Sequence, residues 1–367
     1  MQVVTGLLAV LMSLNLGSSV VAHSPRPNAA MEVKPIERVA PWHDCMLVFR
    51  FGNDPRYSPP FGSSEARGVN DAGQVVGWTM NADRTIGAVL WNRDGTTTSL
   101  GTLGGRNSCA MDINAAGTVV GWAQTASGEA HGFVWTNGVM RDLGAKRTDL
   151  TVAYAINDHG NIVGMSWPIM AGPGSAMGRA VAWTNGTALD LGNCLGAQCS
   201  AGLDINNAGQ TVGWTVDKDY TPHAYVWDGA DRLDLGAGLP GASETRGINA
   251  HGDVVGWAET VGGDRSAALW SGGVLIDLGS PGWRSVANDI ADDGAIAGAE
   301  ASAAYELQPV VWADGEKIEL GSLGGHFGEA YATNGEGDVV GWAETAAGTP
   351  HAFLWRDGLL LDLTPGS

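Results

Sequence analysis

Apolar residues in this chain come in short runs bounded by Gly, Asn or Asp, and no long stretch shows the 3.6-residue period of an amphipathic helix. The runs belong to a recurring phrase, Asn-x-x-Gly-x-Val-Val-Gly-Trp, which is followed by a second Trp and by Asp-Leu-Gly. The clearest copy runs from Asn114 through Trp135 to Gly144. The first position of the phrase recurs from Asn70 to Asn334, 264 residues over six intervals, so seven copies follow one another at a mean period of 44 residues.

Each copy predicts four short β-strands. The runs are rich in Val, Ile, Leu, Phe and Trp, and the Asn and Gly residues between them tolerate the positive φ of tight turns. Four strands at this period are typical of a β-propeller blade, and one such sheet cannot bury both of its faces without neighbouring blades. In the clearest copy the strands are expected at residues 110–114, 118–122, 131–135 and 139–143.

The Trp residues support the same architecture. Of the 15 Trp residues, 12 occupy two positions of the repeat, seven on the third strand and five on the second. A large flat ring that recurs once per blade suits a contact between blades. We therefore predict an all-β, seven-bladed β-propeller. The alternative is an open β-solenoid, which needs capping segments that we do not find at the C-terminal end of the sequence.

The phrasing resembles the HAF family of extracellular repeats, named for the tripeptide His-Ala-Phe. The chain contains this tripeptide at residues 351–353, with near-matches at 131–133 and 223–225, and the resemblance covers residues from about 66 to 363. It implies an exported protein with a repeat fold, and it carries over neither an activity nor a catalytic residue. Three positions depart from the repeat: Ala291 for Asn and Ala299 for Trp in the sixth copy, and Met165 for Trp in the third.

The negative net charge limits the kinds of partner that the protein can bind. The net charge is −19 at pH 7 and the pI is about 4.6, which argues against nucleic acid and against an anionic membrane surface. An acidic surface serves solubility, or else it suits a cationic partner or divalent ions. No Gly-x-Ser-x-Gly, His-Glu-x-x-His or dinucleotide-binding motif occurs, and we expect no cofactor and no metal.

The N-terminal region differs from the repeats. Residues 1–22 resemble a secretory signal peptide, although they contain no Lys or Arg, and they imply a secreted or periplasmic protein without membrane insertion after removal of the leader. Residues 23–64 form a Pro-rich preface in which residues 45–51 could be a strand that helps to close the ring. The propeller is expected to occupy residues 65–367, as a monomer.

The four Cys residues permit disulfides in an exported chain. Cys194 and Cys199 flank one inter-blade loop and are the favoured pair, while Cys45 and Cys109 both lie near the first blade and form the second candidate pair. Their spacing does not suit a single zinc site.

Several polar residues recur with the repeat and are interpreted as structural. Three His residues share one position on third strands that lie far apart, so they are not expected to bind one metal ion. The Asp residues before the fourth-strand Leu are interpreted as a charged edge that opposes aggregation. The acidic residues of the turns between first and second strands are too sparse for calcium loops. These sets are His131, His223 and His351; Asp142, Asp190, Asp234, Asp277 and Asp362; and Asp71, Asp158, Asp292 and Asp293.

Departures from the repeat indicate where a ligand could bind. The interval across the turn between first and second strands is seven residues in every copy, whereas the second-to-third-strand interval is 14 residues in six copies and 19 in the third. Variation is therefore concentrated on one rim, and binding surfaces are usually loops on a rigid scaffold. The residues of this rim that repetition does not require are Trp167, Trp283, Arg284 and His326, with Tyr305 as a further stacking candidate.

These observations predict a non-catalytic binding module or scaffold that recognises a protein or a glycan on the variable rim. One alternative is a purely structural extracellular repeat protein. The other is a polysaccharide hydrolase or lyase with an axial site, which would require convergent ionisable side chains with perturbed pKa values. No catalytic residue is assigned.

Overall fold

The computed structural model describes residues 60–364 apart from residues 145–148, 169–177, 193–198, 220, 303 and 305. They belong to one compact unit that begins at Pro59. Within this part of the chain 28 strands form seven four-stranded antiparallel sheets. In the same part no helix is long and apolar enough to cross a membrane. The predicted strand at residues 45–51 lies outside it.

The seven blades follow the sequence repeat, four strands to a copy. Blade 1 contains β1 (Ser64–Val69), β2 (Val75–Met80), β3 (Ile86–Trp91) and β4 (Thr97–Gly101). Blade 2 contains β5 (Gly104–Ile113), β6 (Val119–Thr125), β7 (Ala130–Thr136) and β8 (Val139–Asp142). Blade 3 contains β9 (Asp149–Ile156), β10 (Ile162–Pro168), β11 (Arg179–Thr184) and β12 (Thr187–Asp190). Blade 4 contains β13 (Cys199–Ile205), β14 (Thr211–Val216), β15 (Pro222–Asp228) and β16 (Asp231–Asp234).

The last three blades have the same composition. Blade 5 contains β17 (Ser243–Ile248), β18 (Val254–Glu259), β19 (Arg265–Ser271) and β20 (Val274–Asp277). Blade 6 contains β21 (Ser285–Ile290), β22 (Ile296–Ala301), β23 (Leu307–Ala313) and β24 (Glu316–Glu319). Blade 7 contains β25 (Gly324–Thr333), β26 (Val339–Thr345), β27 (Pro350–Arg356) and β28 (Leu359–Asp362).

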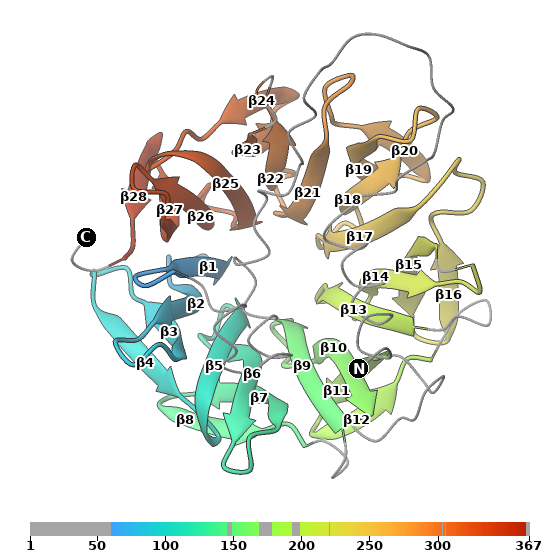
Figure 1. Ribbon diagram of the computed structural model, residues 1–367. Helices are drawn as coiled ribbons and strands as arrows, with labels where there is room; N and C mark the ends of the chain where they lie inside the picture. The colour runs from blue at the N-terminus through green and yellow to red at the C-terminus, as the bar shows by residue number, and fades with distance from the viewer. Residues whose placement is uncertain are drawn as a thin grey trace, which may run out of the picture. The chain divides into compact units, whose positions relative to one another are not determined.

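The blades form a closed ring with the first strand of each blade innermost (Figure 1). Each inner strand contacts the inner strands of both neighbouring blades, and β1 packs against β25, β26 and β27 to close the ring. The prediction of a seven-bladed β-propeller is confirmed. The solenoid alternative is wrong, because the first and last repeats pack against each other instead of ending in caps.

The Gly after the Val pair is required by a bulge in the inner strand. In blade 1 the pairing of β1 with β2 shifts between Ala66 and Gly68, so Arg67 is an extra residue. The bulge brings the carbonyl oxygen of Glu65 over Gly77, where a Cβ atom would lie 1.9 Å from that oxygen. The same contact, at 1.9–2.1 Å, recurs in every blade at Gly121, Gly164, Gly213, Gly256, Gly298 and Gly341.

Hydrophobic residues from the third and fourth strands hold the blades together. The Leu of Asp-Leu-Gly in one blade and the third-strand Trp of the next blade share one apolar cluster, as Leu100 of blade 1 and Trp135 of blade 2 do. This pairing occurs at all seven junctions, and Leu363 with Trp91 closes the ring. The predicted use of the third-strand Trp residues between blades is therefore correct.

The recurring Asn forms a hydrogen-bonded ladder around the axis. Its Oδ1 accepts main-chain N–H groups of its own turn, and its Nδ2 donates to the main-chain oxygen of the equivalent residue in the next blade. The ladder lacks its side chain at Ala291, so the bond from blade 6 to blade 7 is missing. The bonds, 2.8–3.5 Å long, run from Asn70 to Asn114, Asn114 to Asn157, Asn157 to Asn206, Asn206 to Asn249, Asn249 to Ala291 and Asn334 to Asn70.

A second set of bonds links third strands to the next inner strand. A hydroxyl near the start of the inner strand accepts a main-chain N–H from the preceding blade, as Ser64 accepts from Ala352 at 2.8 Å. At the junction of blades 6 and 7 the hydroxyl is replaced by Gly328, and the residue opposite is Pro309, which has no N–H to donate. The other acceptors are Ser108, Thr151, Ser200, Ser243 and Ser285.

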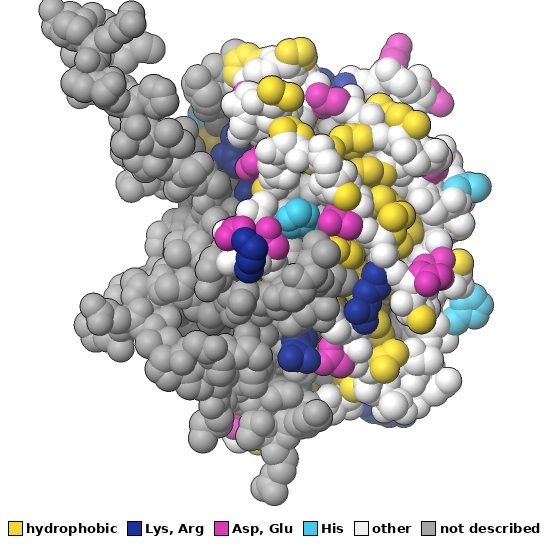
Figure 2. All heavy atoms as spheres, turned by 90° about the vertical axis from the view of Figure 1, so that its right-hand side faces the viewer, with side chains coloured by type: hydrophobic (Ala, Val, Ile, Leu, Met, Phe, Trp, Pro, Cys, Tyr) yellow, Lys and Arg dark blue, Asp and Glu magenta, His cyan; other side chains and the backbone are white. Residues whose placement is uncertain are grey.

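The fourth strands are outermost and expose apolar as well as charged side chains. Leu233, Val274 and Ile276 are 59%, 60% and 43% exposed. Figure 2 shows hydrophobic side chains at the surface among Asp, Glu, Lys and Arg on this side of the molecule. The predicted charged edge is therefore only part of this surface.

Candidate functional site

The bulge of each inner strand places one extra side chain in a single layer around the axis. Arg246 of blade 5 reaches Glu329 of blade 7 at 4.0 Å, two blades further on, so these side chains must point toward the axis. Inner strands run from the variable rim to the turns that carry the Asn ladder, and the bulge lies between the two. The seven residues of this bulge layer are Arg67, Met111, Tyr154, Leu203, Arg246, Asn288 and Tyr331.

The bulge layer is divided into a polar and a less polar half. Blades 5, 6, 7 and 1 contribute two Arg, one Asn and one Tyr, and three of these inner strands carry a Glu two residues before the bulge. We call this group the polar arc: Glu65, Arg67, Glu244, Arg246, Asn288, Glu329 and Tyr331. Blades 2 to 4 contribute Met111, Tyr154 and Leu203, and their inner strands carry Cys109, Val152 and Ala201 in place of the Glu.

Arg246 connects three blades. Its Nε donates to Glu244 Oε1 at 3.0 Å, and its Nη1 donates to Asn288 Oδ1 at 2.7 Å. Asn288 in turn donates from Nδ2 to Glu329 Oε1 at 2.9 Å and to the main-chain oxygen of Ala330 at 2.7 Å. A planar guanidinium and a planar amide are thereby held in fixed orientations.

Arg67 repeats this arrangement in blade 1. Its Nη2 donates to Glu65 Oε2 at 2.5 Å, and the same oxygen accepts from Trp78 Nε1 at 3.2 Å. The guanidinium carbon lies 4.3 Å from the centre of the Tyr331 ring of blade 7, in cation–π contact. The Arg67 side chain is 13% exposed and that of Arg246 is 20% exposed, whereas Glu65 is fully buried.

The electrostatic surroundings of Arg246 favour its charged form. Burial opposes the charge of Arg246, but Glu244 and Glu329 outweigh it and raise the pKa of the guanidinium above its usual value. Burial, helped by Arg284 and Arg246 and opposed by Glu244, lowers the pKa of the nearby Arg265 to about 10. Arg265 lies 3.9 Å above the Trp257 ring. Three guanidinium groups therefore face three Glu carboxylates in this region.

A second axial layer lies one residue beyond the bulge and contains three Asp residues. Asp204 accepts main-chain N–H groups from Ile205 of its own strand at 2.7 Å and from Ile248 of the next blade at 2.8 Å. Burial, and then Asp289 and Asp112, raise its pKa to about 8. Asp112 and Asp289 make the same pairs of bonds, and burial raises the pKa of each to about 6.

The residues predicted on the variable rim do not gather in one place. Trp167 is a buried residue of β10, packed against Gly178, so its ring is not presented to a ligand. Trp283 is partly exposed, and Arg284 is exposed near the polar arc, within electrostatic range of Arg265. His326 is exposed and pairs through Nδ1 with Glu306 at 2.9 Å. Tyr305 lies outside the described residues.

Only one cysteine of each predicted disulfide lies among the described residues. Cys109 and Cys199 are buried on β5 and β13. Their predicted partners, Cys45 and Cys194, fall outside the residues that the structure describes, so both pairings remain predictions.

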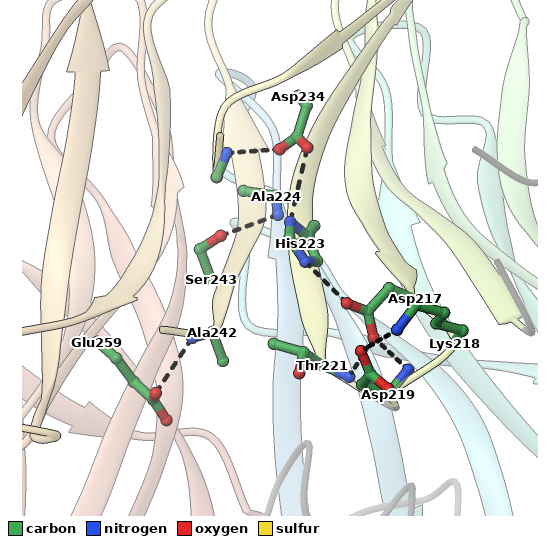
Figure 3. Close-up of polar contacts among 11 residues, drawn as sticks. Asp217, Lys218, Asp219, Thr221, His223, Ala224, Asp234, Ala242, Ser243 and Glu259 are labelled. Carbon is green, nitrogen blue, oxygen red and sulfur yellow. Dashed lines mark hydrogen bonds and ion pairs between the residues drawn. The ribbon is translucent and has the colours of Figure 1, made fainter. Parts of the chain in front are cut away.

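The recurring His residues pair with the recurring fourth-strand Asp residues. His131 and His351 lie 2.7 and 2.8 Å from Asp142 and Asp362. His223 lies between Asp217 and Asp234, at 3.5 and 3.6 Å (Figure 3). The Asp residues also accept main-chain N–H groups two residues on, so besides forming an edge they fix the turn that leaves the blade. These bonds come from Gly144, Gly192, Gly236, Gly279 and Thr364.

The acidic residues of the inner turns connect blades. Asp71 accepts the N–H of Gly335 at 3.0 Å, Asp158 that of Ala115 at 2.9 Å, and Asp292 that of Ala250 at 2.7 Å. Among the residues described, no group of three or more His, Cys, Asp or Glu could hold a metal ion.

Reasoning from the sequence missed the polar arc, although a signal was present. The first and fifth copies contain Ser-Glu-x-Arg-Gly at residues 64–68 and 243–247, and no other copy does. In addition, the second, fourth and sixth copies alone have an Asp at one shared position, at residues 112, 204 and 289. Both signals lie on inner strands, whereas the variation in loop length points to the rim.

Comparison with family models and with characterised proteins finds no match. Among solved structures, the β-propeller domain of the Trilobed protease from Pyrococcus furiosus, which has an open velcro topology, is similar over 82% of this chain and 96% of that one, at 11% identity and a TM-score of 0.57. Acylaminoacyl peptidase from Pyrococcus horikoshii matches over 82% and 52%, at 12% identity and 0.56. A puromycin-hydrolyzing peptidase from Mycobacterium tuberculosis matches over 84% and 54%, at 13% identity and 0.59.

These likenesses concern the fold alone. The chain spans about half the length of the two whole peptidases. In this chain each described sheet consists of four consecutive strands, and hydrogen bonds from Asn334 to Asn70 and from Ala352 to Ser64 connect blade 7 with blade 1. The chain is an all-β, seven-bladed β-propeller similar to the propeller domains of peptidases.

Proposed function

We propose that this protein is a non-catalytic binding module that takes its ligand at the variable-rim end of the axis, against the polar arc. The observation that supports this most strongly is the break of symmetry on four consecutive inner strands. Structural positions of this fold repeat from blade to blade, whereas Arg246, Asn288 and Glu329 form one hydrogen-bonded network that the other three blades lack. Arg67 of blade 1 lies over the Tyr331 ring of blade 7, two residues along the strand from Glu329. Oriented polar groups on a rigid scaffold are what a specific binding site requires.

The runner-up, a polysaccharide hydrolase or lyase, has one observation in its favour. Asp112, Asp204 and Asp289 lie near the axis with raised pKa values, as catalytic acids often do. Both carboxylate oxygens of each residue, however, accept main-chain N–H groups and connect two blades. This favours a structural role for the three carboxyl groups.

An array of immobilised glycans, combined with a reducing-end assay on polysaccharides, tests the proposal. We expect binding without turnover, and we expect Arg67→Ala combined with Arg246→Ala to abolish the binding. Arg179→Ala is the matched control, because Arg179 forms an exposed ion pair with Asp190 on the outer side of blade 3. Turnover that Asp204→Asn removes without unfolding the protein would establish the enzyme, and no arc-dependent binding would favour a purely structural role.

The resemblance to HAF repeats supports a secreted or periplasmic location, which is also a proposal. Expression of the full chain in a Gram-negative host, followed by fractionation and N-terminal sequencing, tests it. We expect a product that has lost residues 1–22. A full-length product that stays in the cytoplasm would contradict this location.

A further inference from the structure

We infer that the ligand of the polar arc is a neutral, hydroxyl-rich glycan rather than an anion or a cation. The inference rests on the proposed binding function and specifies the chemistry of its ligand. It follows from three properties of the bulge layer and its neighbours: a balance of charge, planar groups in fixed orientations, and a less polar opposite side.

The charges of the arc are already paired. Glu65 neutralises Arg67 at 2.5 Å, and Glu244 neutralises Arg246 at 3.0 Å. Glu329 faces Arg246, and Arg265 adds a third guanidinium to the three carboxylates. Arg284 and Glu259, which also act on Arg265, add one charge of each sign. A charged ligand would have to break one of these partly buried pairs and leave an uncompensated charge, which is strongly unfavourable. The arc therefore offers hydrogen bonds with no excess of either sign of charge among its own groups.

The polar groups of the arc are planar and carry both donors and acceptors. The guanidinium groups of Arg67 and Arg246 can present two parallel N–H donors, and the Asn288 amide and Glu329 carboxylate add acceptors. Their mutual hydrogen bonds restrict rotation, so little side-chain entropy is lost when a ligand binds. Adjacent hydroxyl groups of a sugar ring donate and accept at a spacing that matches such paired groups.

The other half of the bulge layer provides mainly apolar surface. Met111, Tyr154 and Leu203 occupy the same repeat position as Arg67 and Arg246, and all three are partly exposed. A pyranose ring has hydroxyl groups at its edge and C–H groups on its faces. A ligand placed between the two halves can direct hydroxyls to the arc and C–H groups to these three side chains.

An array carrying neutral, uronic-acid and sulfated glycans tests the inference on the full chain. We expect neutral glycans to bind, with a Kd that changes less than about twofold between about 0.05 and 0.5 M NaCl, since neutral ligands gain nothing from charge attraction. Arg67→Lys and Arg246→Lys retain the positive charge but lose the paired donors, so each should weaken binding about tenfold or more. Leu203→Ala should weaken it less, and Arg179→Ala should leave it unchanged.

The outcomes separate this inference from the proposed function. Binding of acidic glycans that depends on Arg67, falls steeply with salt and survives Arg67→Lys would overturn the neutral-ligand inference but keep the binding function. Absence of arc-dependent binding to any glycan would overturn the neutral-ligand inference and would also count against the proposed binding function. Near-UV circular dichroism of each variant checks that the Trp-rich contacts between blades remain, and Arg246→Gln serves where Arg246→Lys does not fold.

Discussion

The Asn ladder predicts that a buried polar side chain of a turn contributes substantially to stability. Asn157 makes three hydrogen bonds through its side chain: Nδ2 donates to Asn206 O at 2.9 Å, and Oδ1 accepts from the N–H groups of His159 at 3.1 Å and Asn161 at 2.9 Å. At about 1 kcal/mol for each bond, Asn157→Ala should lower the free energy of unfolding by about 2–3 kcal/mol.

Blade 6 provides a natural comparison for this substitution. Ala291 occupies the ladder position there, yet its turn keeps the main-chain bonds of the other blades, with Ala291 N donating to Ala295 O at 2.9 Å. Asn157→Ala should therefore leave the turn intact and remove only the side-chain bonds. The reciprocal change, Ala291→Asn, completes the ladder between blades 6 and 7 and should raise the free energy of unfolding by about 1 kcal/mol.

Urea unfolding followed by Trp fluorescence measures both effects, with thermal unfolding as a second probe. Each kcal/mol should shift the Tm by about 2 °C for a domain of this size. Asn92→Ala is the control, because Asn92 bonds to Thr96 at 3.1 Å in an exposed outer turn and should contribute little. A loss of less than about 0.5 kcal/mol for Asn157→Ala, equal to that of the control, would refute the ladder as a source of stability.

Three further predictions concern the inner strands and the second strand that packs under the bulge. Because burial raises the pKa of Asp204 from 3.8 to about 8, the folded state holds this proton more tightly, so unfolding free energy should fall as pH rises from about 4 to 8. The Asp204→Asn variant should show a flatter profile by urea unfolding, and an unchanged slope would contradict the assignment. Gly256→Ala places a Cβ atom 1.9 Å from Glu244 O and should cost about 3 kcal/mol or more, whereas Gly262→Ala, with ordinary contacts beyond 3.5 Å, should be nearly neutral in the same assay. Ser108→Ala leaves the buried N–H of Ala88 without its acceptor and should cost about 1–3 kcal/mol, and equal stability of mutant and wild type would show that the hydroxyl bonds do not hold adjacent blades.

The repeat in the sequence was sufficient to predict the fold, the number of blades and the approximate strands. Only the ends of the strands were less accurate: the inner strand of blade 2 was expected at residues 110–114 and extends over Gly104–Ile113. The strand continues toward the rim across a second register shift, between Gly104 and Ser108. A pattern of apolar residues does not report this extension, because residues 104–108 are Gly, Arg, Asn and Ser.

The candidate site depended on tertiary structure far more. The repeat favours Trp167 as a binding residue because repetition does not require a Trp there, but its side chain is buried on β10 beside Gly178. The polar arc was hidden because its members look ordinary one at a time: a Glu and an Arg two residues apart, or a Tyr in a strand. Their connection arises from the register of four inner strands around one axis.

Sequence alone determined that this protein is a ring of seven similar blades, because each blade needs the same Gly under the bulge and the same Leu and Trp between sheets, and six of the seven use the same Asn in the turn. Tertiary structure decided which of the non-repeating residues meet. Arg246 and Glu329 belong to copies that are two repeats apart, and they lie 4.0 Å apart only because closure of the ring brings every inner strand to the axis. Spacing along the chain predicts local geometry, whereas contact across an axis depends on how all seven blades pack together.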